Sequence, residues 1–355
     1  MGNVIDYLNW RGDLPLERIP FCPVDALVLS AVSYVHFDGL TGYVPCALGT
    51  AAERYLAAPS GRRGRYRCRE DLDLLRAVGR AERFARLEIT GWWDRFVPEE
   101  ETQFAAVAVA LGDGSVCLSF RGTDSTLVGW KEDFNMSFMD VVPAQLAAAE
   151  LIQQTAGSCV GPLRLGGHSK GGNLAAAGAS MCPAKVRDRI QAVYSFDGPG
   201  FSPYLAARPG YQELLTRIYS FVPKSSVVGL LLAHEEPYTV VDSDQKGLFQ
   251  HDLYSWQVLG SDFVRLEEVD AGSRMIDRTL KNWLSGLSCQ ERETVTDTLY
   301  ELLSSGDAQL VREALEPANL AGALRAALDV PPRDLLTLAS SLGRLAGAAL
   351  RSLQV

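Results

Sequence analysis

The stretch from Pro162 to Gly172, Pro-Leu-Arg-Leu-Gly-Gly-His-Ser-Lys-Gly-Gly, constrains this chain more than any other. It contains the pattern G-x-S-x-G with Ser169 at its centre, an apolar run before it and a run of small residues, 173–180, after it. This order predicts a strand, a tight turn and a helix. A serine on such a turn stands above the edge of a sheet, and the glycines allow the neighbouring backbone to approach closely. Ser169 is therefore the candidate nucleophile.

Strand and helix signals alternate along the middle of the chain. The apolar segments 104–111 and 115–120 flank Gly112-Asp113-Gly114, which is typical of a hairpin. A helical pattern follows, and further short apolar runs are bounded by Pro, Gly, Ser or Asp; the helix is expected at 143–155 and the strands at 192–196, 217–222 and 238–241. Alternating strands and helices predict an α/β fold with a mostly parallel central sheet flanked by helices.

Helical patterns predominate at both ends of the chain. Residues 1 to about 95 are predicted to be mainly helical, with helices at 23–34 and 71–86, and to belong to one domain that ends near residue 285. Ser288 and Glu291 form a capping-box pattern, and Pro331-Pro332 precedes a last amphipathic helix. We expect residues 286–355 to form a helical extension that caps the sheet or packs on a second copy of the chain.

Composition excludes several classes of partner. The net charge is −9, so the chain has no basic excess for a phosphate backbone and we expect no nucleic-acid partner. The seven cysteines are scattered without C-x-x-C or zinc spacing, which favours reduced thiols, a cytoplasmic location and no metal. We expect no cofactor. No apolar run is long enough for a transmembrane segment, and the first residues lack a secretory signal pattern.

A serine nucleophile needs a base, usually a histidine held by a carboxylate, and in this fold they follow in the order serine, acid, histidine. Only four histidines exist. His36 precedes Ser169, and His168 is expected to point away from its neighbour in the turn. His251, in a loop after the last predicted strand, is favoured over His234, which fits a helix end.

The acid should close a strand between the serine and the histidine. Asp197 follows the strand 192–196 and precedes a glycine-rich turn, although a turn aspartate that binds its own backbone also fits this position. Asp242 and Asp244, after the next strand, are the alternatives. An oxyanion hole of this kind uses backbone N–H groups, predicted here to be those of Lys170 and Thr123.

Several segments resemble the lipase class 3 group of α/β-hydrolases. Residues 120–123 resemble its oxyanion loop and residues 167–172 its nucleophile turn. The chain is more similar to a bacterial branch of that group known as a domain of unknown function, on residues 5–10, 195–200 and 251–256. This resemblance spans about residues 1–285 and implies an α/β-hydrolase fold with extra N-terminal and C-terminal helices.

The chain departs from the true class 3 lipases at two positions. Lys170 replaces the leucine that usually follows the serine, and the segment Tyr219–Pro223 lacks the carboxylate that those lipases carry there. The second departure is the reason for placing the acid at Asp197.

The expected activity is cleavage of a carboxylic ester, from a small molecule or a lipid, by Ser169, His251 and Asp197 through an acyl-enzyme. An acyltransferase or thioesterase would use the same residues. A non-catalytic interaction protein on a hydrolase scaffold is the alternative of a different class.

Overall fold

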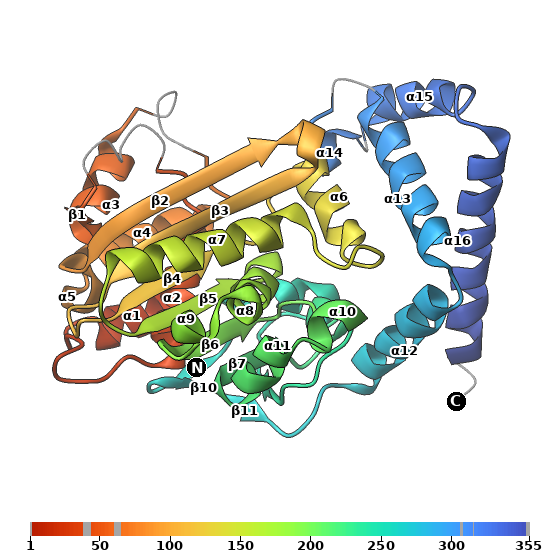
Figure 1. Ribbon diagram of the computed structural model, residues 1–355. Helices are drawn as coiled ribbons and strands as arrows, with labels where there is room; N and C mark the ends of the chain where they lie inside the picture. Colours follow the sequence, from red (N-terminus) through yellow and green to blue (C-terminus); the bar gives the residue numbers. More distant parts are fainter. Residues whose placement is uncertain (1, 38–43, 60–64, 306–307, 315, 353–355) are drawn as a thin grey trace.

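The computed structural model describes residues 2–37, 44–59, 65–305, 308–314 and 316–352 (Figure 1). A 9-stranded sheet runs through the molecule. The order across it is β1 (Cys46–Ala47), β2 (Glu88–Val97), β3 (Thr102–Ala110), β4 (Val116–Phe120), β5 (Leu163–His168), β6 (Ile190–Phe196), β7 (Ile218–Pro223), β8 (Tyr238–Val241) and β11 (Arg265–Leu266). Strands β4 to β8 are parallel, and the outer strands are antiparallel to their neighbours. A separate pair joins β9 (Val258–Leu259) to β10 (Asp262–Phe263).

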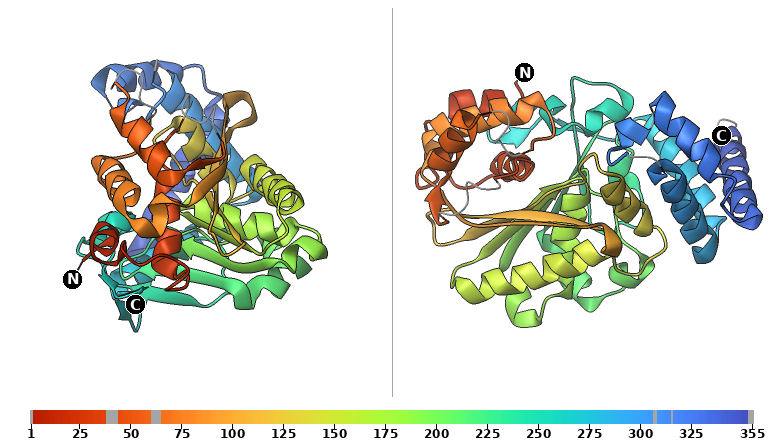
Figure 2. Two further views of the ribbon diagram at one scale, coloured as in Figure 1. Left: turned by 90° about the vertical axis from the view of Figure 1, so that its left-hand side faces the viewer. Right: turned by 90° about the horizontal axis from the view of Figure 1, so that it is seen from above.

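Helices cover both faces of the sheet (Figure 2). One apolar core lies under the N-terminal helices α1 (Val4–Arg11), α2 (Pro23–Val32), α3 (Leu48–Ala57), α4 (Arg69–Arg80) and α5 (Glu82–Ala85). The second lies under α7 (Pro143–Ser158), α8 (Lys170–Met181), α9 (Ala184–Arg187), α10 (Pro203–Ala206) and α11 (Pro209–Leu214). The sheet is mostly parallel and helices bury both of its faces, as a parallel sheet requires. The predicted α/β-hydrolase architecture is therefore confirmed.

The predicted hairpin is present, since β3 and β4 pair from Ala106–Phe120 to Ala110–Val116. The expectation of a helical N-terminal region is wrong in its last part, where β2 runs antiparallel to β3. Only one face of β2 is buried, and a bulge between Ile89 and Gly91 interrupts its alternation of apolar and polar residues. That irregular pattern is the physical reason why the sequence did not indicate a strand.

The C-terminal helices form a separate layer beside the sheet (Figures 1 and 2). They are α12 (Ala271–Ser285), α13 (Cys289–Ser304), α14 (Val311–Ala314), α15 (Pro317–Ala326) and α16 (Pro332–Ser352). The predicted capping box is present: Ser288 Oγ accepts the N–H of Glu291 at 3.2 Å, and the Glu291 carboxylate accepts that of Ser288 at 2.8 Å. The C-terminal helical part begins with α12, earlier than the expected start at residue 286. Helix α12 packs on α16, where the indole N–H of Trp283 donates to the carbonyl of Ser341.

In the part of the chain that the structure describes, no helix combines the length and apolar character needed to cross a bilayer. All seven cysteines are free thiols. Among the same residues, no group of His, Cys, Asp and Glu side chains is arranged to hold a metal ion.

Candidate active site

The turn between β5 and α8 places Ser169 at the carboxyl edge of the sheet. Its backbone has φ 58° and ψ −133°, a region that non-glycine residues rarely adopt outside functional sites. A Cβ at Gly167 would lie 2.3 Å from the carbonyl carbon of Gly171, and one at Gly171 would lie 2.2 Å from the carbonyl oxygen of Phe120. Only glycine at these two positions allows β4, β5 and α8 to meet, which explains the pattern around the serine.

Ser169 belongs to a hydrogen-bonded chain of three side chains from separate parts of the sequence. Its Oγ lies 3.0 Å from Nε2 of His251, and Nδ1 of His251 lies 2.6 Å from Oδ2 of Asp197. Asp197 directly follows β6, and His251 ends the short helix η4 (Gly247–His251). Asp197 is completely buried, and its Oδ1 accepts the hydroxyl of Ser226 at 2.5 Å and the N–H of Gly229 at 3.1 Å. These donors orient the carboxylate toward the imidazole.

The other histidines have different partners. His234 lies in a loop and not at a helix end, with Nδ1 2.9 Å from Glu236 and Nε2 3.1 Å from the carbonyl of Leu231. His36 pairs with Asp94 at 2.9 Å. The structure therefore brings His251, and not these two, to Ser169.

The alternative acids also bind elsewhere. The carboxylate of Asp242 accepts the N–H of Ser243 at 3.0 Å. The main-chain N–H of Asp244 donates to the carbonyl of Ser255 at 3.0 Å, and among the described residues its carboxylate forms no hydrogen bond with His251. The imidazole of His251 hydrogen bonds to Asp197 instead.

His168 does not point away from the site, contrary to the expectation from its place in the turn. Its ring lies 4.7 Å from the ring of His251, between centroids. Burial lowers the pKa of His168 well below its usual value, and the nearby His251 lowers it further, so the ring is neutral. The Tyr34 hydroxyl donates to Nδ1 at 2.9 Å, and Nε2–H donates to the carbonyl of His251 at 2.7 Å. His168 therefore supports the backbone of His251.

The segment after His251 is anchored to the N-terminal region. Arg67 lies 3.2 Å from the carboxylate of Asp252 and packs over the ring of Tyr254. The Tyr254 hydroxyl donates to the buried carboxylate of Asp71 at 2.8 Å. The N-terminal helices thus fix the loop that presents the imidazole.

The predicted oxyanion loop, residues 120–123, lies directly against the turn at Ser169. A Cβ at Gly122 would lie 3.1 Å from the Cβ of Ser169. The main-chain N–H groups of Thr123 and Lys170 have no acceptor among the described residues. The Thr123 hydroxyl donates to the carboxylate of Asp133 at 2.6 Å, so its backbone N–H is the group left for a ligand.

Helix α6 (Leu127–Asn135) holds both of these residues through consecutive acids. Glu132 forms an ion pair with the side chain of Lys170 at 2.8 Å, and both side chains are buried. Asp133 accepts the hydroxyl of Thr123, and burial raises the pKa of Asp133 from its ordinary value of 3.8 to about 6. Sequence reasoning missed this role of α6, because nothing in the sequence shows that these two acids contact Lys170 and Thr123.

Arg121 anchors the other end of the same loop. Its guanidinium donates to the carbonyl of Ser33 at 2.7 Å and to Asp94 at 3.0 Å, and it is 1% exposed. The loop is therefore held from α2, from β2 and from α6 at once. A loop restrained on all sides can present N–H groups in fixed positions, as stabilisation of a developing negative charge requires.

Residues 78–301 of the chain match the protein-family model described as Mbeg1-like. A search of curated proteins found no match. Among solved structures, the chain is similar to a mutant form of MDLA from Penicillium cyclopium, with 15% identity, a TM-score of 0.40 and coverage of 70% of this chain and 87% of that one. It is also similar to lipase II from Rhizopus niveus, with 15% identity, a TM-score of 0.39 and coverage of 72% and 89% respectively.

Proposed function

This chain belongs to the Mbeg1-like family, and we propose that it is a serine hydrolase that cleaves carboxylic esters. The observation that supports this most is the hydrogen-bonded chain of Ser169, His251 and Asp197. It lies beside two backbone N–H groups that have no acceptor in the described part of the chain. Nucleophile, base, orienting acid and oxyanion donors are the parts that acyl transfer to a serine needs.

In the first half of the reaction, Ser169 Oγ attacks the ester carbonyl while Nε2 of His251 takes the hydroxyl proton. The N–H groups of Thr123 and Lys170 stabilise the oxyanion of the tetrahedral intermediate. As this intermediate collapses, the bond to the alcohol breaks and His251 gives its proton to the leaving oxygen. Asp197 accepts the Nδ1–H throughout and stabilises the imidazolium that forms.

In the second half, His251 takes a proton from a water molecule as its oxygen attacks the acyl-enzyme carbonyl. When this second intermediate collapses, the bond to Ser169 Oγ breaks, His251 returns the proton to Oγ, and the acid is released. The side chain of His251 is 31% exposed, so water contacts the imidazole. This exposure favours hydrolysis over transfer to another alcohol, an amine or a thiol, because transfer requires water to be excluded. Acyl transfer and thioester cleavage remain the variants that use the same residues.

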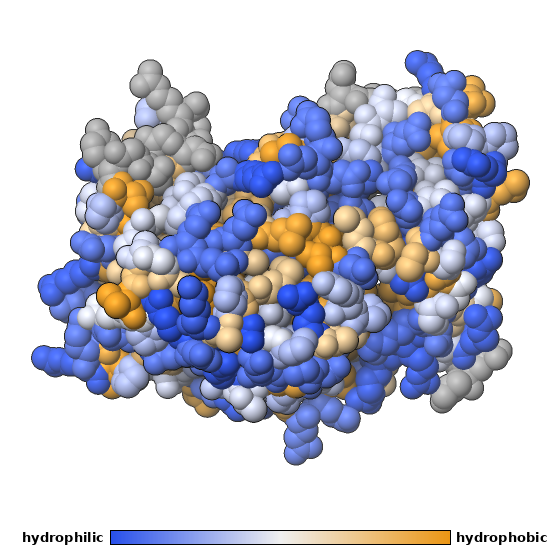
Figure 3. All heavy atoms as spheres, viewed as in Figure 1, coloured by the Kyte–Doolittle hydropathy of each residue, from blue (hydrophilic) through white to orange (hydrophobic). Residues whose placement is uncertain are grey.

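Apolar surface next to the oxyanion loop supports an ester with an apolar acyl part. Helix α6 follows that loop directly and carries the exposed rings of Trp130 and Phe134, whose centroids lie 5.5 Å apart. Figure 3 shows apolar surface gathered near the middle of one face, between α7 and the C-terminal helices. Contact with an acyl chain would remove such surface from water.

The test is labelling of the purified protein with a fluorophosphonate, followed by mass spectrometry of the modified peptide. We expect modification at Ser169, and hydrolysis of p-nitrophenyl esters that is lost in Ser169→Ala. Ser180→Ala, on the same helix α8 but remote from the turn, is the matched control and should hydrolyse the esters normally. A folded protein that neither reacts with the probe nor cleaves any ester would favour a non-catalytic interaction protein.

Three finer expectations stay predictions. They are a cytoplasmic location, membership of a bacterial branch, and self-association through the C-terminal helices. Self-association is supported by two exposed leucines, Leu324 on α15 and Leu336 on α16. Light scattering of the purified protein would test it.

A further inference from the structure

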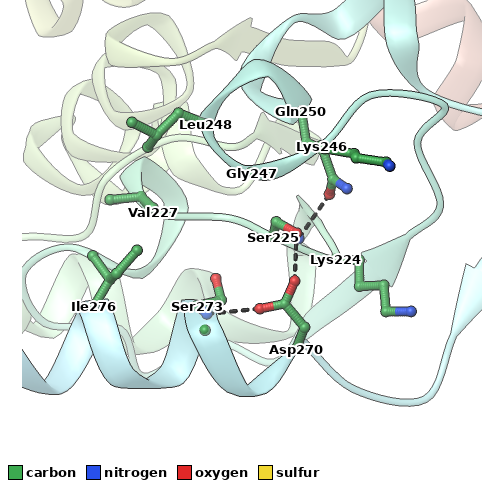
Figure 4. Close-up of a pocket in the computed structure, with 11 residues that line it drawn as sticks. Lys224, Ser225, Val227, Lys246, Gly247, Leu248, Gln250, Asp270, Ser273 and Ile276 are labelled. Atoms are coloured by element: carbon green, nitrogen blue, oxygen red, sulfur yellow. Dashed lines mark hydrogen bonds between the residues drawn. The ribbon is translucent and has the colours of Figure 1, made fainter. Parts of the chain in front are cut away.

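A cavity of about 420 Å³ lies between the end of β7, η4 and the beginning of α12 (Figure 4). A cavity of this size falls within the range of small-molecule sites in proteins. Two of the segments that line it also serve the proposed active site. Ser225 precedes Ser226, the hydroxyl donor to Asp197, and Gln250 precedes His251. The amide oxygen of Gln250 accepts the N–H of Ser225 at 2.7 Å and joins the two segments at the cavity wall.

The two sides of the cavity differ in chemistry. Figure 4 shows Lys224 and Lys246 on one side, and the aliphatic side chains of Val227, Leu248 and Ile276 on the other. Leu248 is 65% exposed and Ile276 is 36% exposed, so water contacts apolar surface that a ligand could cover. The cavity therefore offers a cationic end and an apolar end.

Lys224 and Lys246 are both exposed at the rim of the cavity. Among the residues that the structure describes, no carboxylate forms an ion pair with Lys224 or Lys246. The one carboxylate in the cavity wall belongs to Asp270, which caps α12 by accepting the N–H of Ser273 at 2.7 Å and also accepts the hydroxyl of Ser225. Both lysines line the same side of the cavity in a chain whose net charge is −9 (Figure 4).

We propose that this cavity binds an anionic amphiphile, with its phosphate or carboxylate between Lys224 and Lys246 and its alkyl chain against Val227, Leu248 and Ile276. Ammonium groups bind such anions by charge-assisted hydrogen bonds, and the aliphatic wall supplies the hydrophobic contribution. The bound molecule would bridge η4 and α12 and so restrain the segment that ends at His251. The binding itself does not depend on the proposed ester hydrolysis.

The test uses octyl phosphate below its micelle concentration and isothermal titration calorimetry on the full chain carrying Ser169→Ala. This variant removes the proposed nucleophile, so binding is measured whether or not the protein is an esterase. We expect saturable binding of octyl phosphate, and much weaker binding of inorganic phosphate and of octanol. Each methylene that becomes buried should raise affinity roughly fourfold, so butyl phosphate should bind much more weakly than octyl phosphate.

Two substitutions separate the two ends of the site. Lys224→Gln with Lys246→Gln should lower the affinity for octyl phosphate roughly tenfold and leave that for octanol unchanged. Lys185→Gln, an exposed lysine on α9, is the matched control and should have no effect. Leu248→Ser should lower the affinity for octyl phosphate and leave the affinity for inorganic phosphate unchanged. Leu328→Ser, which changes an exposed leucine elsewhere, is the matched control and should alter neither affinity.

Three results would overturn the proposal. Equal affinity for octyl phosphate and octanol would show that the lysines hold no anion. Equal affinity for inorganic phosphate and octyl phosphate would show that the aliphatic wall holds no chain. Retention on vesicles that contain phosphatidic acid, without binding of monomeric octyl phosphate, would show that this surface docks on a membrane and that the cavity is not the site.

Discussion

The ammonium group of Lys170 and the carboxylate of Glu132 form an ion pair at 2.8 Å, with their side chains 1% and 0% exposed. Lys170 also donates to the carbonyl of Gln103 at 2.8 Å, and Glu132 accepts the N–H of Ala144 at 2.9 Å. One buried pair thus joins the start of α8, beside Ser169, to α6, β3 and α7. The residue that departs from the class 3 lipase pattern thus links the turn at Ser169 to α6, the helix whose Asp133 also binds Thr123.

Glu132→Gln should strongly destabilise the fold, because it leaves the ammonium of Lys170 buried without a counter-charge. Removing one partner of a buried ion pair typically costs about 3–5 kcal/mol. Urea unfolding followed by tryptophan fluorescence would measure the loss. The double variant Glu132→Gln with Lys170→Met should be less destabilised than the sum of the single changes, since no buried charge remains. Additive costs would mean that the two side chains do not act as a pair.

Asp197→Asn should lower kcat for ester hydrolysis by about 10⁴-fold and leave the fold intact, because an amide cannot hold the imidazole in the required tautomer. Initial rates on p-nitrophenyl butyrate would measure it. Asp242→Asn is the matched control, since Asp242 follows β8, two strands away from β6 in the sheet, and its carboxylate accepts the N–H of Ser243. If Asp242→Asn proves the damaging change, the acid is assigned to the wrong strand.

Asp133 should make stability fall as pH rises from about 4 to about 6. Burial raises its pKa in the folded chain to about 6, whereas the unfolded chain loses this proton near its ordinary value of 3.8. Between these values the folded state binds more protons than the unfolded state, so the free energy of unfolding decreases with pH. Two pKa units correspond to an upper limit of about 3 kcal/mol.

Denaturant unfolding of the wild type and of Asp133→Asn at a series of pH values would isolate this contribution. The difference in unfolding free energy between the two proteins should change in favour of the variant as pH rises from 4 to 6, and should be constant above about 7. Parallel stability curves over the whole range would contradict an elevated pKa for Asp133.

His168→Phe should lower kcat about tenfold and leave KM unchanged. Phenylalanine keeps the packing against His251 but cannot donate to its carbonyl, and a lost hydrogen bond of this kind is worth about 1 kcal/mol. Steady-state kinetics would separate the two parameters. Tyr34→Phe removes only the hydroxyl at Nδ1 of His168 and should have a smaller effect. A change confined to KM would indicate that His168 contacts the substrate and does not position the base.

The parts that could be predicted from the sequence have strong local signals. The strand, turn and helix around Ser169 follow from glycines that close contacts require, and the hairpin of β3 and β4 follows from Gly112-Asp113-Gly114. Strand β2 could not be predicted, because its half-exposed, bulged pattern has no clear period. The order of elements along the chain also limited the base to two histidines, although the catalytic roles of Ser169, His251 and Asp197 stay predictions.

The sequence by itself determined the α/β architecture, since the alternation of apolar strands and small-residue helices admits few other ways to bury both faces of a parallel sheet. Only the tertiary structure decided which side chains meet. Arg67 contacts the loop of His251 across 185 residues of sequence, and Glu132 reaches Lys170 across 38. Side chains so far apart are brought together by packing of the whole fold, and such packing has no signature in the local pattern of either partner.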